Sequence, residues 1–310
     1  MGDLDASALR IARQQLHQAV GALEMVGLTV PAKVLRAMEA LAQSFVQRPE
    51  RVSEDAANRM ERASFALVEY LEGVLKGKTA SPVALFAQYR DVLELVGDER
   101  VHPADLWPQS WQWIDVALPR EATALPDSAD VRAHFYTQIL RLVRLDDPRA
   151  ALALRELSLG FAAAQTRLEP RVFWKLCTAY FEAVGLGLCA HDVYGKRAAS
   201  RILQQYRGLE RAQAEVSERL AQDLLFFCAQ ACPAEAASAP LLVAVRQAYG
   251  LTQTKPVDYE AAQFGRFDPA LLVQVRRRIA AATETWSAVA GGDANRLKLA
   301  TEQFAQVAEL

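Results

Sequence analysis

Apolar residues recur every three or four positions through almost the whole chain, and this spacing constrains the fold more than any other feature. No stretch of useful length alternates apolar and polar residues as a half-buried strand would. β-branched residues are sparse, whereas alanine, leucine, glutamate, arginine and glutamine dominate, and that composition favours helices. The sequence therefore predicts an all-α fold.

Prolines, glycines and capping residues divide the first 97 residues into four helices. We expect them at residues 4–26, 31–47, 54–76 and from Ser81-Pro82 to about Gly97. Ser53 precedes Glu54 and Asp55, which is typical of an N-cap followed by an acidic first turn. Four helices joined by short loops predict an antiparallel four-helix bundle over residues 1–97.

The remaining chain divides into a connector, a second bundle and part of a third module. Residues 98–127 are rich in proline and contain the run LWPQSWQWI, so we expect an ordered connector whose tryptophans pack across the two halves. A second helical bundle is expected over residues 128–250, with helices at 129–145, 148–165, 170–189, 194–232 and 240–249. Residues 251–310 hold another connector and the start of a third helical module, with helices at 269–290 and 294–310.

Bulk properties exclude several classes of function. The 310 residues contain no apolar run of eighteen, so a transmembrane helix is excluded, and the net charge of −2 gives no reason to expect a nucleic-acid surface. No cysteine belongs to a CxxC pair, which indicates a reduced, cytoplasmic protein. A zinc site from Cys189, His191, Cys228 and Cys232 is conceivable, but small cysteines packed between helices fit the spacing better, and we expect no metal.

The first helix carries a histidine and a glycine beside its apolar stripe. At 100° per residue, His17 lies about 110° from the centre of that stripe. Gly21 follows one turn later, and a glycine inside a helix costs roughly 1 kcal/mol relative to alanine, so we expect another protein to approach closely there. The stripe itself consists of Leu9, Ala12, Leu16, Ala19, Val20 and Leu23.

The stretch LHQAVGALEMVGL, residues 16–28, resembles the motif of histidine phosphotransfer (Hpt) domains, which are four-helix bundles with an exposed phosphorylated histidine. His17 occupies the histidine position, and Gly21, Ala22, Met25, Gly27 and Leu28 occupy the small, methionine and glycine positions that follow. The family usually has a lysine or arginine immediately before the first glycine, whereas this chain has Val20. Arg13 or Arg10 on the same flank could supply the charge.

A wider resemblance covers nearly the whole chain. The stretches RVFWKLCTAYFEAV, VRQAYGLTQ and DPALLVQVRRRIAAATETWSAVAGGD are similar to the N-terminal helical region of the large CheA-like hybrid histidine kinases that control type IV pili and twitching motility. That resemblance implies a chemosensory signalling role, a receiver domain or kinase module as partner, and neither nucleic acid nor membrane as partner. It implies no cofactor in this chain, because magnesium would belong to the receiver.

Two functions from different classes remain open. In the first, His17 accepts a phosphoryl group and passes it to a receiver aspartate, while Arg13, Gln18, Gly21 and Glu24 contact the partner. In the second, the bundle is a degenerate Hpt-like scaffold that docks signalling proteins without being phosphorylated, as Val20 favours. No set of catalytic residues at readable spacing supports an independent enzyme. Both ends lack helix caps, so we expect an excerpt of a longer polypeptide or a chain without flanking helices.

Overall fold

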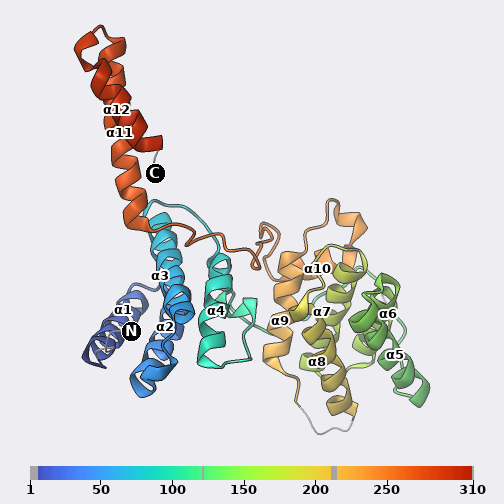
Figure 1. The fold of residues 1–310 in the computed structure, drawn as a ribbon. Coiled ribbons are helices and arrows are strands. Elements are labelled where there is room, and N and C mark those ends of the chain that lie inside the picture. Colours follow the sequence, from blue (N-terminus) through green and yellow to red (C-terminus); the bar gives the residue numbers. More distant parts are fainter. Residues whose placement is uncertain (1–5, 121, 211–214, 309–310) are drawn as a thin grey trace. The chain divides into compact units, whose positions relative to one another are not determined.

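A computed structural model describes residues 6–120, 122–210 and 215–308 (Figure 1). Twelve α-helices and five short 3₁₀ helices make up the regular structure of these residues, and they include no strand. The predicted all-α fold, built from several helical modules, is therefore confirmed. The chain forms two compact units: the first joins residues 1–101 to residues 259–310, and the second spans residues 102–258.

The first unit is organised around helix α2 (Thr29–Gln47), which packs against α1 (Ala6–Met25), α3 (Glu54–Leu75) and α4 (Phe86–Val96). Buried side chains of α2 face these neighbours. The ends of the helices follow their capping residues, since the Ser53 side chain accepts a hydrogen bond from the Ala56 amide and Gly97 ends α4 at a φ of 93°. Short 3₁₀ turns precede α3 and α4, at Pro49–Arg51 and Pro82–Leu85.

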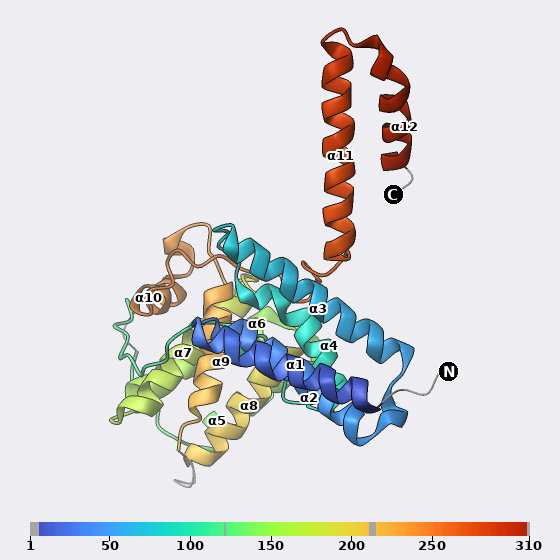
Figure 2. The same ribbon diagram turned by 90° about the vertical axis from the view of Figure 1, so that its left-hand side faces the viewer.

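The C-terminal part of the first unit is a helical hairpin. Helix α11 (Pro269–Ala290) is followed by a 3₁₀ turn (Ala294–Arg296) and by α12 (Leu297–Ala308), which runs back along α11 (Figure 2). Asp268 caps α11 by accepting a hydrogen bond from the Ala270 amide, and Pro269 occupies the first helical position.

The second unit has a core of aromatic side chains between its helices. It contains a 3₁₀ turn (Pro103–Leu106), α5 (Ala129–Leu145), α6 (Pro148–Ala164), α7 (Leu168–Gly185), α8 (Val193–Glu210), α9 (Glu218–Gln230), a 3₁₀ turn (Ala236–Ser238) and α10 (Pro240–Ala248). Thirteen of the eighteen residues of α7 are buried, and it packs against α6, α9 and α10, which makes it the central helix of this unit. Trp174 of α7 contacts the rings of Phe135, Phe161 and Tyr206.

The prediction of a single helix over residues 194–232 is wrong. The chain forms α8 and α9 instead, and the Ser217 hydroxyl oxygen accepts a hydrogen bond from the Leu220 amide to begin α9. Gln205 of α8 also binds the intervening backbone, because its side-chain oxygen accepts from the Ser217 amide. Serine competes for local backbone hydrogen bonds and so favours a cap over a helix interior. Residues 211–214 lie outside the described part of the chain.

The tryptophan-rich segment is anchored inside the second unit. Trp107 lies edge-on to Phe226, and Trp111 is stacked on Tyr249 with 6.0 Å between ring centroids. The Tyr249 hydroxyl donates to the Gln112 carbonyl and accepts from the Ile114 amide. These ring contacts join residues 107–114 to α9 and to the end of α10.

Candidate functional site

His17 lies on an open face of α1. Its side chain is 71% exposed, and its Nδ1 atom lies 2.9 Å from the Glu39 Oε1 atom on α2. A carboxylate can only accept a hydrogen bond, so Nδ1 is the donor of this pair. The interaction consequently leaves Nε2 facing away from Glu39, as the ring nitrogen available to another molecule.

Val20, three residues after His17, faces the seam between α1 and α2. Its side chain is 4% exposed, and it is the only buried one among the α1 side chains that the structure describes. The expected apolar stripe is therefore covered only in part: Leu9, Leu16 and Leu23 are half-buried, and Ala12 and Ala19 are exposed. α1 packs mainly along α2, so a single neighbour covers a narrower stripe than a closed bundle would. A basic side chain at position 20 would be forced into this seam.

The other predicted contact residues surround His17 on α1. Arg13 and Gly21 lie one turn before and after it, and Gln18 and Glu24 are exposed beside them. A Cβ atom added to Gly21 would meet no atom within 4 Å, so the surface next to His17 is open. Packing among the described residues therefore does not require a glycine at position 21.

Helix α2 supplies two residues to this face that the sequence did not reveal. Glu39 binds His17, and Arg36, one turn earlier on α2, forms an ion pair with Glu24. Both depend on the antiparallel register of α1 against α2, which no local motif encodes. The Arg36 guanidinium places a positive charge on the α1–α2 face although position 20 has none. We call this surface, formed by Arg13, His17, Gln18, Gly21, Glu24, Arg36 and Glu39, the His17 face.

The remaining histidines are structural or peripheral. His102 is buried against the rings of Tyr194, Phe226 and Phe227, and its Nδ1 accepts a hydrogen bond from the Ala104 amide. Burial, helped by Arg219, Arg201 and Arg197, lowers the pKa of His102 to about 3. Burial also lowers the pKa of His191, whereas His134 is exposed on α5.

The cysteines have the character of packing residues. All four are free thiols: Cys177 and Cys228 are buried, Cys189 is partly buried, and Cys232 is exposed. Burial raises the pKa of the Cys189 thiol to about 12 and that of Cys228 above its ordinary value. Such thiols are poor nucleophiles and poor metal ligands. Across the described ranges, no three His, Cys, Asp or Glu side chains form a group that could hold a metal ion.

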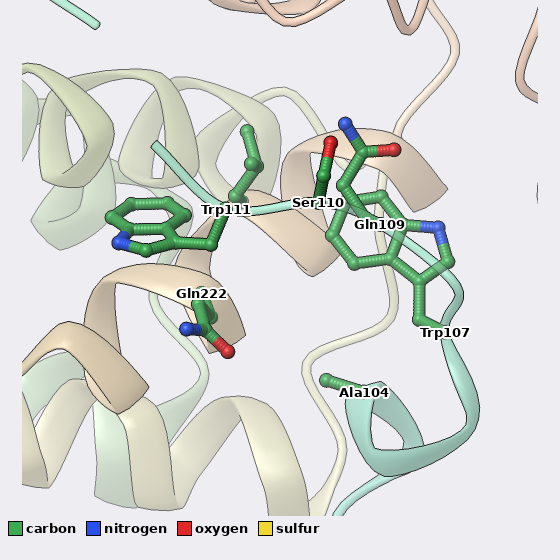
Figure 3. Close-up of a pocket in the computed structure, with 7 residues that line it drawn as sticks. Ala104, Trp107, Gln109, Ser110, Trp111 and Gln222 are labelled. Carbon is green, nitrogen blue, oxygen red and sulfur yellow. The ribbon is translucent and has the colours of Figure 1, made fainter. Parts of the chain in front are cut away.

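A small pocket lies beside the tryptophan-rich segment. Its cavity volume is about 30 Å³, far below the roughly 300 Å³ or more of pockets that hold small organic ligands. Figure 3 shows Trp107 and Trp111 on opposite sides of it, with Gln222 of α9 also in the lining. A pocket of this size in the second unit has no room for a ligand of ordinary metabolite size.

None of the described helices combines the length and the apolarity that a membrane span requires. No curated protein and no solved structure matches the chain. Residues 120–262, which include helices α5 to α10, match the family described as the FimL scaffold protein second domain.

Proposed function

We propose that this protein is a signalling scaffold of a type IV pilus chemosensory system, and that the His17 face docks a receiver domain. Two lines of support come from separate parts of the chain. Residues 120–262 match a domain of a scaffold protein. The first helix resembles an Hpt docking helix, and the His17 side chain is largely exposed among the described residues of the first unit.

The openness of the His17 face carries this proposal. Gln18 and Glu24 are exposed, His17 projects into solvent, and nothing surrounds the position that a Gly21 side chain would occupy. The face also holds charges of both signs, from Arg13 and Arg36 and from Glu24 and Glu39, which suits an exchangeable, polar interface.

Titration calorimetry with the receiver domains of the same chemosensory system tests the docking. We expect Gly21→Arg to abolish or strongly weaken binding, because a long side chain would stand between α1 and the partner. The fold should be kept, because the position of the new side chain is open. Ala57→Arg, at an exposed position on α3, is the matched control and should bind as the native chain does. Equal binding by both variants, or no binding to any receiver, would overturn the proposal.

A second function, phosphotransfer, is favoured by the contact between His17 and Glu39. A carboxylate that accepts from Nδ1–H holds the imidazole in the tautomer whose Nε2 lone pair is free to attack phosphorus. A bond would form between Nε2 and phosphorus while the bond from phosphorus to the leaving oxygen of ATP or of a phosphoaspartate breaks. Arg36 could then neutralise part of the phosphoryl charge in the absence of a basic residue at position 20.

Incubation with the cognate CheA-like kinase module and labelled ATP distinguishes the two functions. Acid-labile label on the native chain but not on His17→Gln would establish a relay histidine, and Glu39→Gln should then slow labelling without loss of docking. The control is that the kinase labels another substrate and that this chain is folded. If the chain then takes up no label, docking remains the function of the His17 face.

The proposal assigns roles to the rest of the chain. Residues 1–97 form the docking bundle, residues 98–127 the connector, residues 128–250 the scaffold bundle and residues 251–310 the start of a third module. The protein would act in the cytoplasm without a cofactor of its own, and any magnesium would be bound by the receiver. It would have no active site independent of a kinase partner.

A further inference from the structure

One side of α8 carries positive charge and no carboxylate. Five residues at alternating steps of four and three share this side, and we call them the α8 face: Val193, Arg197, Ser200, Gln204 and Arg207. The longer polar side chains among them, those of Arg197, Gln204 and Arg207, are exposed. From Val193 to Leu209 the helix contains no acidic residue, so every charge along this length is positive.

The other cations of α8 are used in packing. Helix α8 packs against both α5 and α9. Lys196 pairs with Asp146 at the end of α5, at 2.9 Å. Arg201 donates from Nη1 to the Asp223 carboxylate of α9 at 2.7 Å, and its side chain remains 39% exposed. These two ion pairs border the α8 face and leave Arg197 and Arg207 out.

Arg197 and Arg207 rest on aromatic rings. Neither pairs with a carboxylate of the described residues. The Arg197 Cζ atom lies 6.0 Å from the centre of the Tyr194 ring, and the Arg207 Cζ atom lies 5.4 Å from that of Tyr136 on α5. A guanidinium above a ring is attracted to the ring face and keeps its N–H donors, which point outward in its own plane. Both side chains are therefore held in place while their donors stay available.

A third arginine adds to the positive charge at one edge of this face. Arg197, Arg201 and Arg219 of α9 all act on the buried ring of His102, since their charges help to lower its pKa. The carboxylates bound to these three guanidiniums are those of Asp105 and Asp223. One positive charge therefore remains in excess, before Arg207 is counted.

We propose that the α8 face binds an acidic segment of another protein, whose carboxylates accept hydrogen bonds from Arg197, Arg207 and the outer edge of Arg201. A carboxylate can take two parallel N–H bonds from one guanidinium. Arg197 and Arg207 are ten residues apart, or about 15 Å along the helix. An extended peptide covers that length with about five residues.

The surroundings of the α8 face suit a peptide better than a nucleic acid. Val193 and Tyr136 are 50% and 41% exposed beside the cations, and they offer apolar contacts to a polypeptide. A nucleic acid is usually held by many phosphate contacts, whereas this chain has a net charge of −2 and only a few free guanidiniums here. This surface lies in the second unit and does not depend on docking at the His17 face.

Fluorescence anisotropy of a labelled oligoglutamate peptide, titrated with the full chain, tests the proposal. A peptide of about ten residues is long enough to span the α8 face. We expect saturable binding that weakens as salt is added, because exposed charges are screened. An oligoglutamine peptide of the same length should not bind.

Substitutions locate the binding surface. Arg197→Gln and Arg207→Gln should each weaken oligoglutamate binding by at least about threefold, because each removes one ion pair with the peptide. Arg277→Gln is the matched control, since it removes the same charge from an exposed position on α11, within a run of three arginines. It should bind the peptide as the native chain does.

Three results would overturn the proposal. The first is no oligoglutamate binding at low salt. The second is equal weakening by Arg277→Gln, because the peptide would then respond only to total charge. The third is binding of oligothymidylate without binding of oligoglutamate, which would assign the α8 face to nucleic acid.

Two further variants separate binding from folding. The double variant Arg197→Glu and Arg207→Glu should lose oligoglutamate and bind oligolysine instead, and circular dichroism must show native helix content. Tyr136→Leu keeps every charge but removes the ring under Arg207, so it should weaken oligoglutamate binding by about threefold. Oligoglutamate binding that survives the charge reversal would show that the peptide binds elsewhere and would refute the proposal.

Discussion

At the scale of the residue, Arg246 is a buried guanidinium that no carboxylate neutralises in the described contacts. It donates hydrogen bonds to the carbonyl oxygens of Cys228, Ala229 and Ala231 at the end of α9, and to those of Leu251 and Thr254 after α10. The carbonyls at the end of α9 have no further turn of helix to supply amide donors, so the Arg246 side chain takes that place and also binds the segment after α10. One residue therefore joins the ends of two helices.

We expect Arg246→Met to lower the free energy of unfolding by at least about 3 kcal/mol, because several buried carbonyl oxygens would lose their donor. Arg246→Lys should recover only part of this lost stability, since the single ammonium group of lysine cannot bind all of these carbonyl oxygens at once. Urea denaturation measures the effect. Arg167→Met removes a largely exposed guanidinium and is the control. If it lowered the free energy of unfolding as much as Arg246→Met does, the structural role given to Arg246 would be contradicted.

His102 makes stability depend on pH. Its pKa is about 3 in the folded chain, against 6.5 for an ordinary histidine, because the ring is buried beside arginines. Between these values the unfolded chain binds a proton that the folded chain does not, so stability is lost as pH falls below 6.5, by up to about 1.4 kcal/mol per pH unit. Asp223 contacts His102, and burial raises its pKa.

We expect His102→Asn to flatten this dependence between pH 5 and 7, as measured by urea denaturation at several pH values. Asparagine can still accept the hydrogen bond from the Ala104 amide, so the cap of the following 3₁₀ turn is kept. Asp223 and His191 are common to both chains, and the difference in slope therefore reports His102. Identical slopes would show that His102 does not titrate on unfolding.

The sequence alone predicted which positions of α1 lie beside His17, because a helical repeat fixes which positions share a face. It could not reach Glu39 or Arg36, which meet α1 only through the register of two packed helices. It placed Val20 in the apolar stripe, in agreement with its burial, but it could not foresee that Ala12 and Ala19 of the same stripe are exposed. These depend on how many neighbours cover α1, which is a tertiary property.

At the scale of the element, most helix boundaries followed from caps and prolines. The helices expected at 129–145 and 269–290 have those bounds in the structure, since Ser128 and Asp268 cap them. The break between α8 and α9 was missed because the surrounding residues are good helix formers. Only Ser217 and the hydrogen bonds of Gln205 mark it: the Ser217 cap is local, whereas the bonds of Gln205 need the residues before α9 to lie beside α8.

We expect Ser217→Ala to lower the free energy of unfolding by about 1 kcal/mol, because the Leu220 amide would lose its capping acceptor. The sign is decisive: in a continuous helix the same substitution would be neutral or stabilising, since alanine has the higher helix propensity. Ser217→Asp keeps an acceptor and should retain stability. Thermal unfolding of the three chains measures the effect, and a stabilised Ser217→Ala would contradict the break.

At the scale of the whole molecule, the first unit is discontinuous in sequence, and a short segment around Phe264 holds its two parts together. Gln88 donates from Nε2 to the Phe264 carbonyl at 2.7 Å, Arg90 pairs with Glu260, and Phe264 lies edge-on to Tyr70. Residues 259–268 have no helical repeat, so the sequence offered no local signal for this docking. It arises from polar contacts to α3 and α4.

Gly265 makes that docking possible. Its φ is +74°, its amide donates to Glu69 of α3, and an added Cβ would lie 2.5 Å from the Arg62 carbonyl oxygen. We expect Gly265→Ala to detach residues 259–268 from α3, because the helix backbone cannot move aside. Hydrogen exchange of the 259–268 amides should then accelerate, while that of the second unit stays unchanged.

The decisive comparison is with Gly77→Ala. Gly77 has nearly the same backbone conformation, with a φ of +72°, but an added Cβ there would meet no atom within 4 Å. Both substitutions carry the cost of a left-handed alanine, roughly 1 kcal/mol, and only Gly265→Ala adds a clash with α3. Exchange in residues 259–268 should therefore respond to Gly265→Ala alone. Equal responses would mean that backbone strain, and not the close approach of Gly265 to α3, determines how residues 259–268 are held.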